Sequence, residues 1–173
     1  MISFSVHSRG ASKVLSSLLF GGAYGLLEYR VIEPLRPSID SALSAFPMPF
    51  GHFYPYHYLV MLPVFLLFGV ISSCSSNERL KSNLLSLTAW LVSSVLVEDL
   101  AYFLARVTLP RPDDPRGGLW FSCPLEWTCM GLPSVLSLAT WHWVAMALGA
   151  LMWVSTSLTS RPTGGRYSGV RSP

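Results

Sequence analysis

Apolar residues gather in four long runs, separated by polar or proline-rich segments. A helix that crosses the hydrocarbon core of a bilayer needs about 20 predominantly apolar residues. By this measure the expected spans cover residues 12–32, 56–73, 82–107 and 133–158. The first is the least regular, because its apolar core of 14–27 is short and the span must take in Glu28 and Arg30 before Pro34 ends it.

The start of the chain has a second interpretation. Arg9 and Lys13 precede the first apolar run, as basic residues precede the apolar core of a signal peptide. The run continues as far as Ile32, which is longer than a signal peptide requires. A first transmembrane helix is therefore the favoured interpretation.

The segments between the runs predict one surface helix and several loops. In 35–46, Leu35, Ile39, Leu43 and Phe46 recur at helical spacing among polar residues, which is typical of an amphipathic helix at the membrane interface. Pro63 is expected to kink the second span. The predicted fold is all-α: a multi-pass integral membrane bundle of about four transmembrane helices plus one interfacial amphipathic helix. Residues 1–159 form its single domain, and 160–173 form a disordered tail.

Composition agrees with a membrane protein and argues against a nucleic-acid partner. The chain is 51% hydrophobic and 12% charged, whereas soluble domains contain about 25% charged residues. The net charge of +3 comes from scattered side chains and forms no basic block. Membrane lipid is the expected partner, and other membrane subunits are a second hypothesis.

An even number of spans places both termini on one side of the membrane. That side would carry more basic residues than the other, which favours termini in the cytoplasm of a cell-membrane protein. The first group is Arg9, Lys13, Arg79, Lys81, Arg161, Arg166 and Arg171, and the second is Arg30, Arg36, Arg106, Arg111 and Arg116. The loop with Cys123 and Cys129 would then lie outside, where the two thiols either form a disulfide or stay free, with Cys74 on the other side.

Two adjacent carboxylates, Glu98 and Asp99, lie in the third apolar run. Each costs about 2.5–3.5 kcal/mol to insert near the centre of a bilayer, so such residues usually face a protein interior and serve a function. Neighbouring helix positions differ by about 100°, so the two cannot face the same partner. We expect one to be functional and the other structural, and Asp99 is favoured for the site because it shares a face with Arg106 and Thr88.

Further polar residues converge on the same half of the predicted bundle. Glu28 ends the first span beyond a ridge of small residues, Ser17, Gly21 and Gly25, which is typical of helix–helix contact in membranes. His142 is expected nine residues into the fourth span, at about the depth of Asp99. Glu28, Glu98 or Asp99, and His142 are therefore predicted to form one polar cluster.

This cluster favours a small membrane enzyme that acts on a lipid or amphiphile. Asp99, Glu98 and Glu28 are the candidate catalytic residues, with Glu28 as a general base. His57, His142 and Asp99 are the candidate ligands of a divalent metal such as zinc, which would activate a water molecule.

Other interpretations stay open at this point. His52 and His57 lie among tyrosines and are also typical of an interfacial aromatic belt. His142 can be a buried residue bonded to a neighbouring helix, and Glu28 can pair with Arg30 or Arg36. The chain contains no H-E-x-x-H or C-x-x-C motif. A non-catalytic accessory subunit of a membrane complex and an ion or proton pathway are the alternative functions.

Overall fold

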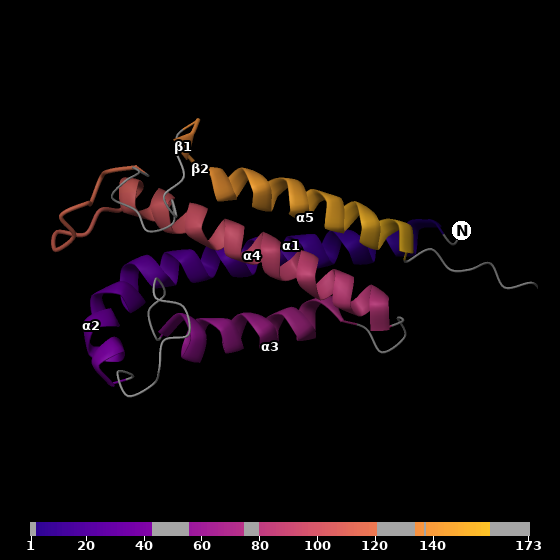
Figure 1. Cartoon of the computed structure of the whole chain (residues 1–173), viewed down its shortest axis with the longest axis horizontal. Coiled ribbons are helices and arrows are strands. Elements are labelled where there is room, and N and C mark those ends of the chain that lie inside the picture. Colours follow the sequence, from indigo (N-terminus) through magenta and orange to yellow (C-terminus); the bar gives the residue numbers. More distant parts are fainter. Residues whose placement is uncertain (1–2, 43–55, 75–79, 121–133, 137, 160–173) are drawn as a thin grey trace, which may run out of the picture.

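The computed structural model describes residues 3–42, 56–74, 80–120, 134–136 and 138–159. In this part of the chain, helices dominate and one short hairpin is present (Figure 1). The α-helices are α1 (Ser3–Leu27), α2 (Glu33–Ala42), α3 (Leu62–Ser73), α4 (Leu80–Thr108) and α5 (Thr140–Thr159). The π-helical segments are η1 (Glu28–Ile32) and η2 (His57–Met61), and the hairpin strands are β1 (Ser134–Val135) and β2 (Leu138–Ala139).

Helix α4 is the centre of the bundle and packs against α1, α3 and α5. All four run along the long axis of the molecule, whereas α2 turns away at one end (Figure 1). Helices α1 and α4 are parallel, because contacts at opposite ends of the interface join residues 73 positions apart. Lys13 reaches Ser86 with that separation, and the Tyr29 and Tyr102 rings meet at 5.4 Å.

Helix α5 runs antiparallel to α4. Near the start of α5, His142 contacts Asp99, and further along it the Trp153 indole donates to Ser93. Residues further along α5 therefore contact residues nearer the start of α4. The first residues of α1 and the last residues of α5 consequently lie at the same end of the bundle (Figure 1).

Glycines allow α1 and α4 to approach closely. A Cβ on Gly21 would lie 2.9 Å from the Glu98 backbone nitrogen, and one on Gly25 would lie 2.8 Å from the Glu98 carbonyl carbon. Real Cβ atoms do not come this near to a backbone, so the two positions require glycine. The small-residue ridge predicted from the sequence is therefore a helix–helix contact, with α4 as its partner.

Pro34 and Pro63 each follow a π-helical turn. The prediction that Pro34 ends the first helix is wrong. The chain passes through η1 and continues into α2. The Glu33 amide donates to the Glu28 carbonyl with π spacing, and the next donor is missing because Pro34 has no N–H. Arg111 donates to the Tyr29 carbonyl, which supplies the missing hydrogen bond. Pro63 likewise follows η2, where the Leu62 amide donates to the His57 carbonyl.

The predicted boundaries need two further corrections. The first helix begins at Ser3, nine positions before the predicted start of the first span. The last helix begins at Thr140 and not at 133, because Ser134 pairs with Ala139 in an antiparallel hairpin. Of the predicted interfacial helix, α2 covers the first part, and 43–55 lies outside the described residues, as does the predicted tail.

The interior contains both apolar and polar residues, and much of the outer surface is apolar. Polar and charged residues are buried between the helices, whereas many large apolar side chains face outward. On α3 and α5, for example, Ile71 is 68% exposed and Leu151 is 63% exposed. The buried polar set is Ser17, Glu28, Ser73, Ser82, Ser86, Ser93, Ser94, Glu98, Arg106, Asp114, His142 and Thr156.

Among the described helices, one passes a test of length and composition for crossing a membrane. This helix is α4, with 29 residues and a mean hydropathy of 1.6 over its most apolar window. The continuous helix His57–Ser73 is apolar but shorter. The all-α bundle is confirmed, and a four-span membrane bundle stays a prediction.

We expect Gly25→Ala to destabilise the bundle, because the added methyl group would collide with the backbone at Glu98. Overpacking of this kind typically costs about 1–3 kcal/mol. The measurement is the melting temperature of the detergent-solubilised protein. Gly22→Ala is the matched control, since a Cβ there comes no closer than 3.9 Å to Val97. Equal melting temperatures for the two variants would contradict the contact.

Candidate functional site

Two carboxyl groups meet where α1 passes into η1 beside α4. The side chains of Glu28 and Glu98 lie close enough to each other for a hydrogen bond, and both residues are buried. Tyr56 donates a hydrogen bond from its hydroxyl to Glu28 Oε1. Two carboxyl groups can share a hydrogen bond only if one carries a proton, since an ionised carboxylate has no donor. We refer to Glu28 and Glu98 as the acid pair.

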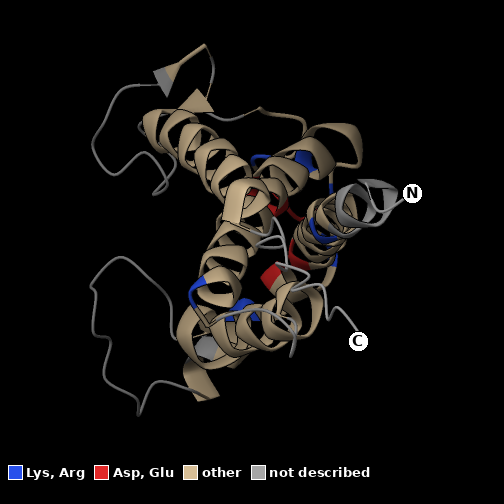
Figure 2. Cartoon of the chain, turned by 90° about the vertical axis from the view of Figure 1, so that its right-hand side faces the viewer, with Lys and Arg blue, Asp and Glu red and all other residues tan. Residues whose placement is uncertain are grey.

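Local structure brings these three residues together. Glu28 is the first residue of η1, and Tyr56 immediately precedes η2. Both π-helical turns therefore present a side chain to the same contact. Glu98 comes from the middle of α4, directly beside the glycine that lets α1 approach. Acidic positions accordingly lie near the middle of the bundle when it is viewed along its length (Figure 2).

The neighbouring carboxylate faces a different helix. Asp99 Oδ2 lies 2.8 Å from His142 Nε2, and His142 Nδ1 lies 3.3 Å from the carbonyl oxygen of Ala139. The His142 side chain is fully buried, and that of Asp99 is 14% exposed. As the helical phase predicts, Glu98 faces α1 and Asp99 faces α5.

The sequence-predicted residues thus form two contacts on adjacent positions of α4. Glu28 pairs with Glu98, and His142 pairs with Asp99. His142 is the third residue of α5 and not the ninth residue of its helix, but it lies at the level of Asp99, as predicted. It still reaches Asp99, since α4 extends beyond the start of α5. Catalytic roles for Asp99, Glu98 and Glu28 stay predictions.

A polar stripe along α4 was missed in the sequence. Every fourth residue carries a polar atom, and all but Tyr102 are buried. Positions four apart lie on nearly the same face of a helix, so the repeat itself is a readable signal. Thr88 is outside this face; it is exposed and donates to the carbonyl oxygen of Leu84. The α4 polar stripe consists of Ser82, Ser86, Trp90, Ser94, Glu98, Tyr102 and Arg106.

Arg106 is buried at the end of this stripe. Its guanidinium donates to the carbonyl oxygens of Leu119 and Trp120 at 2.9 and 3.3 Å and lies over the Phe103 ring. It thereby holds the segment that follows α4 against the bundle. The sequence assigned Arg106 to Asp99 as a charge partner, but the direct contact of Asp99 is with His142.

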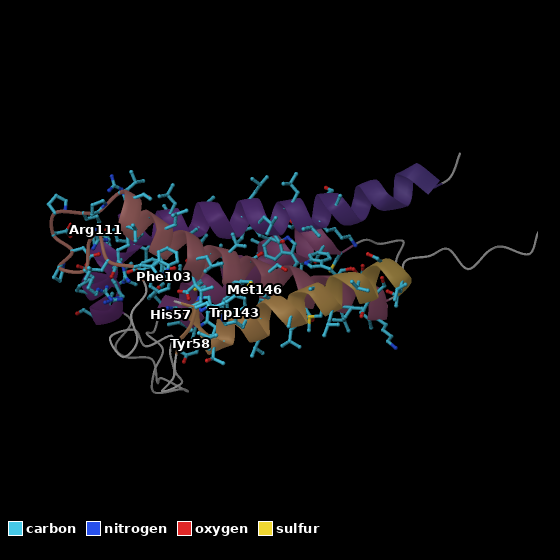
Figure 3. The ribbon with its side chains drawn as sticks, turned by 90° about the horizontal axis from the view of Figure 1, so that it is seen from above. His57, Tyr58, Phe103, Arg111, Trp143 and Met146 are labelled. Atoms are coloured by element: carbon cyan, nitrogen blue, oxygen red, sulfur yellow. The ribbon has the colours of Figure 1, made fainter. Side chains whose placement is uncertain are left out.

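A second charged cluster lies beside this segment and was also missed. Glu33 accepts a hydrogen bond from Tyr102 and forms ion pairs with Arg116 at 2.8 Å and Arg111 at 3.7 Å. Figure 3 places Arg111 at the end of the bundle, beyond Phe103. Arg30 donates to the Leu109 carbonyl oxygen in the same region, so it does not take the predicted place beside Glu28.

The predicted metal site is not supported in the part of the chain that the structure describes. In the part of the chain that is described, no group of three or more His, Cys, Asp or Glu residues could hold a metal ion. Asp99 and His142 are in contact, but both nitrogens of the His142 ring already face oxygen atoms. The centre of the His57 ring in η2 lies 4.0 Å from that of the Tyr56 ring, and the two rings are tilted relative to each other. The three proposed ligands therefore do not form a common site.

Two predictions fall outside the described residues. These are the disulfide between Cys123 and Cys129 and the interfacial position of His52. Cys74 lies just after α3, where its thiol is 3.9 Å from the carbonyl oxygen of Asn83.

No protein-family model, curated protein or solved structure matches this chain. The functional argument therefore rests on the geometry of the acid pair and of the polar residues around it.

We expect Asp99 and His142 to stabilise each other. In a double-mutant cycle with Asp99→Asn and His142→Gln, contacting residues of this kind give an interaction energy of about 0.5–3 kcal/mol. The measurement is unfolding in mixed micelles, titrated with sodium dodecyl sulfate. A control cycle pairs His142→Gln with Asp113→Asn, whose side chain is 64% exposed in the loop after α4. A cycle for Asp99 and His142 as additive as this control would contradict the contact.

Proposed function

We propose that this chain is a multi-pass integral membrane protein and a component of a proton pathway, in which the acid pair binds and releases one proton. The observation that carries the proposal is the close approach of two buried carboxyl groups, those of Glu28 and Glu98, which can share one proton between neighbouring helices. Buried acids of this kind are typical of proton relays in membrane bundles.

The outward-facing apolar side chains support the membrane part of the proposal. Large side chains on α1, α3 and α5, such as Leu19, Leu67 and Val154, are 64%, 59% and 58% exposed. Contiguous apolar surface is unfavourable in water and marks contact with lipid or protein. The polar residues lie inside, where neighbouring helices supply hydrogen-bond partners that lipid cannot supply.

Polar groups on both sides of the acid pair support a pathway. Toward the start of α4, the stripe continues through Ser94 and Ser86, and Lys13 reaches Ser86 at 3.4 Å. Toward the other end, Tyr102 donates to Glu33, and Glu33 pairs with Arg116, whose side chain is 35% exposed. The acid pair is thus the middle of a polar line between the ends of the bundle.

The geometry gives less support to an enzyme that uses His142 as an acid or base. Such a residue needs a free ring nitrogen within reach of the substrate. His142 is fully buried, with Nε2 beside Asp99 and Nδ1 beside the Ala139 carbonyl oxygen. We therefore assign Asp99 and His142 to holding α5 on α4, and the proton to the acid pair.

We expect proton uptake by liposomes that contain the purified protein when a potassium diffusion potential is imposed with valinomycin. Glu98→Gln and Glu28→Gln should each reduce the uptake at least about tenfold, because an amide keeps a hydrogen bond but cannot carry the proton. A pH-sensitive dye inside the vesicles gives the rate. Asp113→Asn is the control and should match the parent protein. Unchanged uptake in both glutamine variants would reject the proposal.

Infrared spectroscopy tests the shared proton directly. The parent protein should show the carbonyl stretch of a protonated carboxylic acid at neutral pH, with the small shift expected in D2O. Glu98→Gln should abolish this band, and Asp113→Asn should keep it. A parent spectrum without the band would show that the acid pair holds no proton.

The membrane location has its own test. We expect the chain to stay in the membrane pellet after extraction with alkaline carbonate, because the apolar faces of α1, α3 and α5 would remain in lipid. Detergent should release it. Release by carbonate alone would contradict an integral membrane protein.

A further inference from the structure

Two buried hydroxyl groups near the acid pair have no hydrogen-bond partner. They are the Tyr24 hydroxyl on α1 and Ser94 Oγ on α4. Tyr24 is 7% exposed and Ser94 is fully buried. A buried hydroxyl without a partner costs free energy, so each such group in a folded protein needs an explanation.

Both hydroxyls lie on the same side of the acid pair. Tyr24 precedes Glu28 by one helical turn, and Ser94 precedes Glu98 by one turn. Each hydroxyl-bearing residue therefore lies on the same helix face as the acid that follows it. Because α1 and α4 are parallel, Tyr24 and Ser94 both lie on the side of the acid pair that is nearer the starts of the two helices. The Tyr24 hydroxyl interacts electrostatically with Glu28 and with Glu98. Gly21 brings α1 against the Ser94 backbone between them.

We propose that the acid pair, Tyr24 and Ser94 form a binding site for a sodium ion, which replaces the shared proton. This inference rests on the proposed function and names the second ion that the same site would take. Hydroxyl and carboxylate oxygens are the ligands that hard cations such as Na⁺ prefer, and both hydroxyls have lone pairs to offer.

Charge favours a monovalent ion. With one shared proton, the site has a net charge of one negative unit, and two carboxylates with a bound Na⁺ have the same net charge. The proton passes to water at the end of the bundle and no bond other than its O–H bond is broken. Mg²⁺ would alter the charge of a buried site and gives up its water molecules reluctantly, so it is not the expected ligand.

The test is protection of the acid pair from dicyclohexylcarbodiimide, which modifies protonated carboxyl groups in apolar surroundings. Protein in liposomes is labelled at fixed pH and ionic strength in choline chloride, sodium chloride or magnesium chloride, and the modified residue is identified by mass spectrometry. We expect saturable protection of Glu28 or Glu98 by Na⁺ alone. The Na⁺ concentration for half-protection should fall as pH rises, because Na⁺ and H⁺ compete.

Variants identify the two hydroxyl ligands. Ser94→Ala and Tyr24→Phe should each raise the half-protecting Na⁺ concentration about tenfold or more, as loss of groups around a metal ion does, while labelling in choline chloride stays as in the parent. Ser93→Ala is the matched control, because Ser93 Oγ accepts from Trp153 and faces α5. Melting temperatures verify that the three variants fold.

The outcomes separate the two proposals. Labelling that Na⁺ does not affect, or that Mg²⁺ suppresses equally, would overturn the sodium site and leave the proton pathway in place. Protection that the Ser94 and Tyr24 variants retain in full would overturn the assigned ligands. Absence of both labelling and the carboxylic acid band would overturn the proposed function together with the sodium site.

Discussion

The close contact between α1 and α4 is the constraint on which the rest of the bundle depends. Gly21 and Gly25 bring the α1 backbone against residues 94–98 of α4 at a separation that leaves no room for a methyl group. The same contact fixes the parallel register in which Lys13 meets Ser86 and Tyr29 meets Tyr102. A different register would move Glu28 away from Glu98, so the acid pair depends on the contact that the small residues allow. Close packing is the main attraction between helices in lipid, where apolar surface gains little from association.

The interior then has to satisfy the polar groups that it encloses. Serines do much of this, because their hydroxyls can donate to the carbonyl of a preceding turn while accepting from another helix. Ser16 donates to the Lys13 carbonyl and accepts from the Trp90 indole, and Ser93 accepts from Trp153. Tyr24 and Ser94 stand apart from this pattern, since their hydroxyls are buried without partners beside the two acids. Among the described residues, Arg111, Asp114 and Trp141 also have a buried polar atom without a hydrogen-bond partner, but these lie away from the acid pair.

Prolines contribute by position and not by ending helices. Each of the two prolines follows a π-helical turn, and these turns place Glu28 and Tyr56 in contact. Because Pro34 has no amide N–H, the Tyr29 carbonyl oxygen accepts a hydrogen bond from Arg111 in its place. Arg111 itself pairs with Glu33. The loop after α4 is therefore connected to the turn that carries Glu28. A π-helical turn inside a helix is often found at a functional site, and here two of them meet at the residue assigned to proton binding.

The sequence by itself determined the helical fold, the extent of α4 and the selection of Glu28, Glu98, Asp99 and His142 as polar residues that face other helices. These features depend on local hydrophobicity, helical spacing and the cost of charge in an apolar run, all of which are local properties of the chain. Tertiary structure decided the partners. Phase shows that Glu98 and Asp99 face apart, but only packing decides that Glu98 meets Glu28 and Asp99 meets His142. The three predicted metal ligands do not form one group among the described residues for the same reason, since a similar predicted depth along the helices says nothing about distance across the bundle. The start of α5 and the passage through Pro34 were also set by contacts distant in sequence, which a local pattern does not contain.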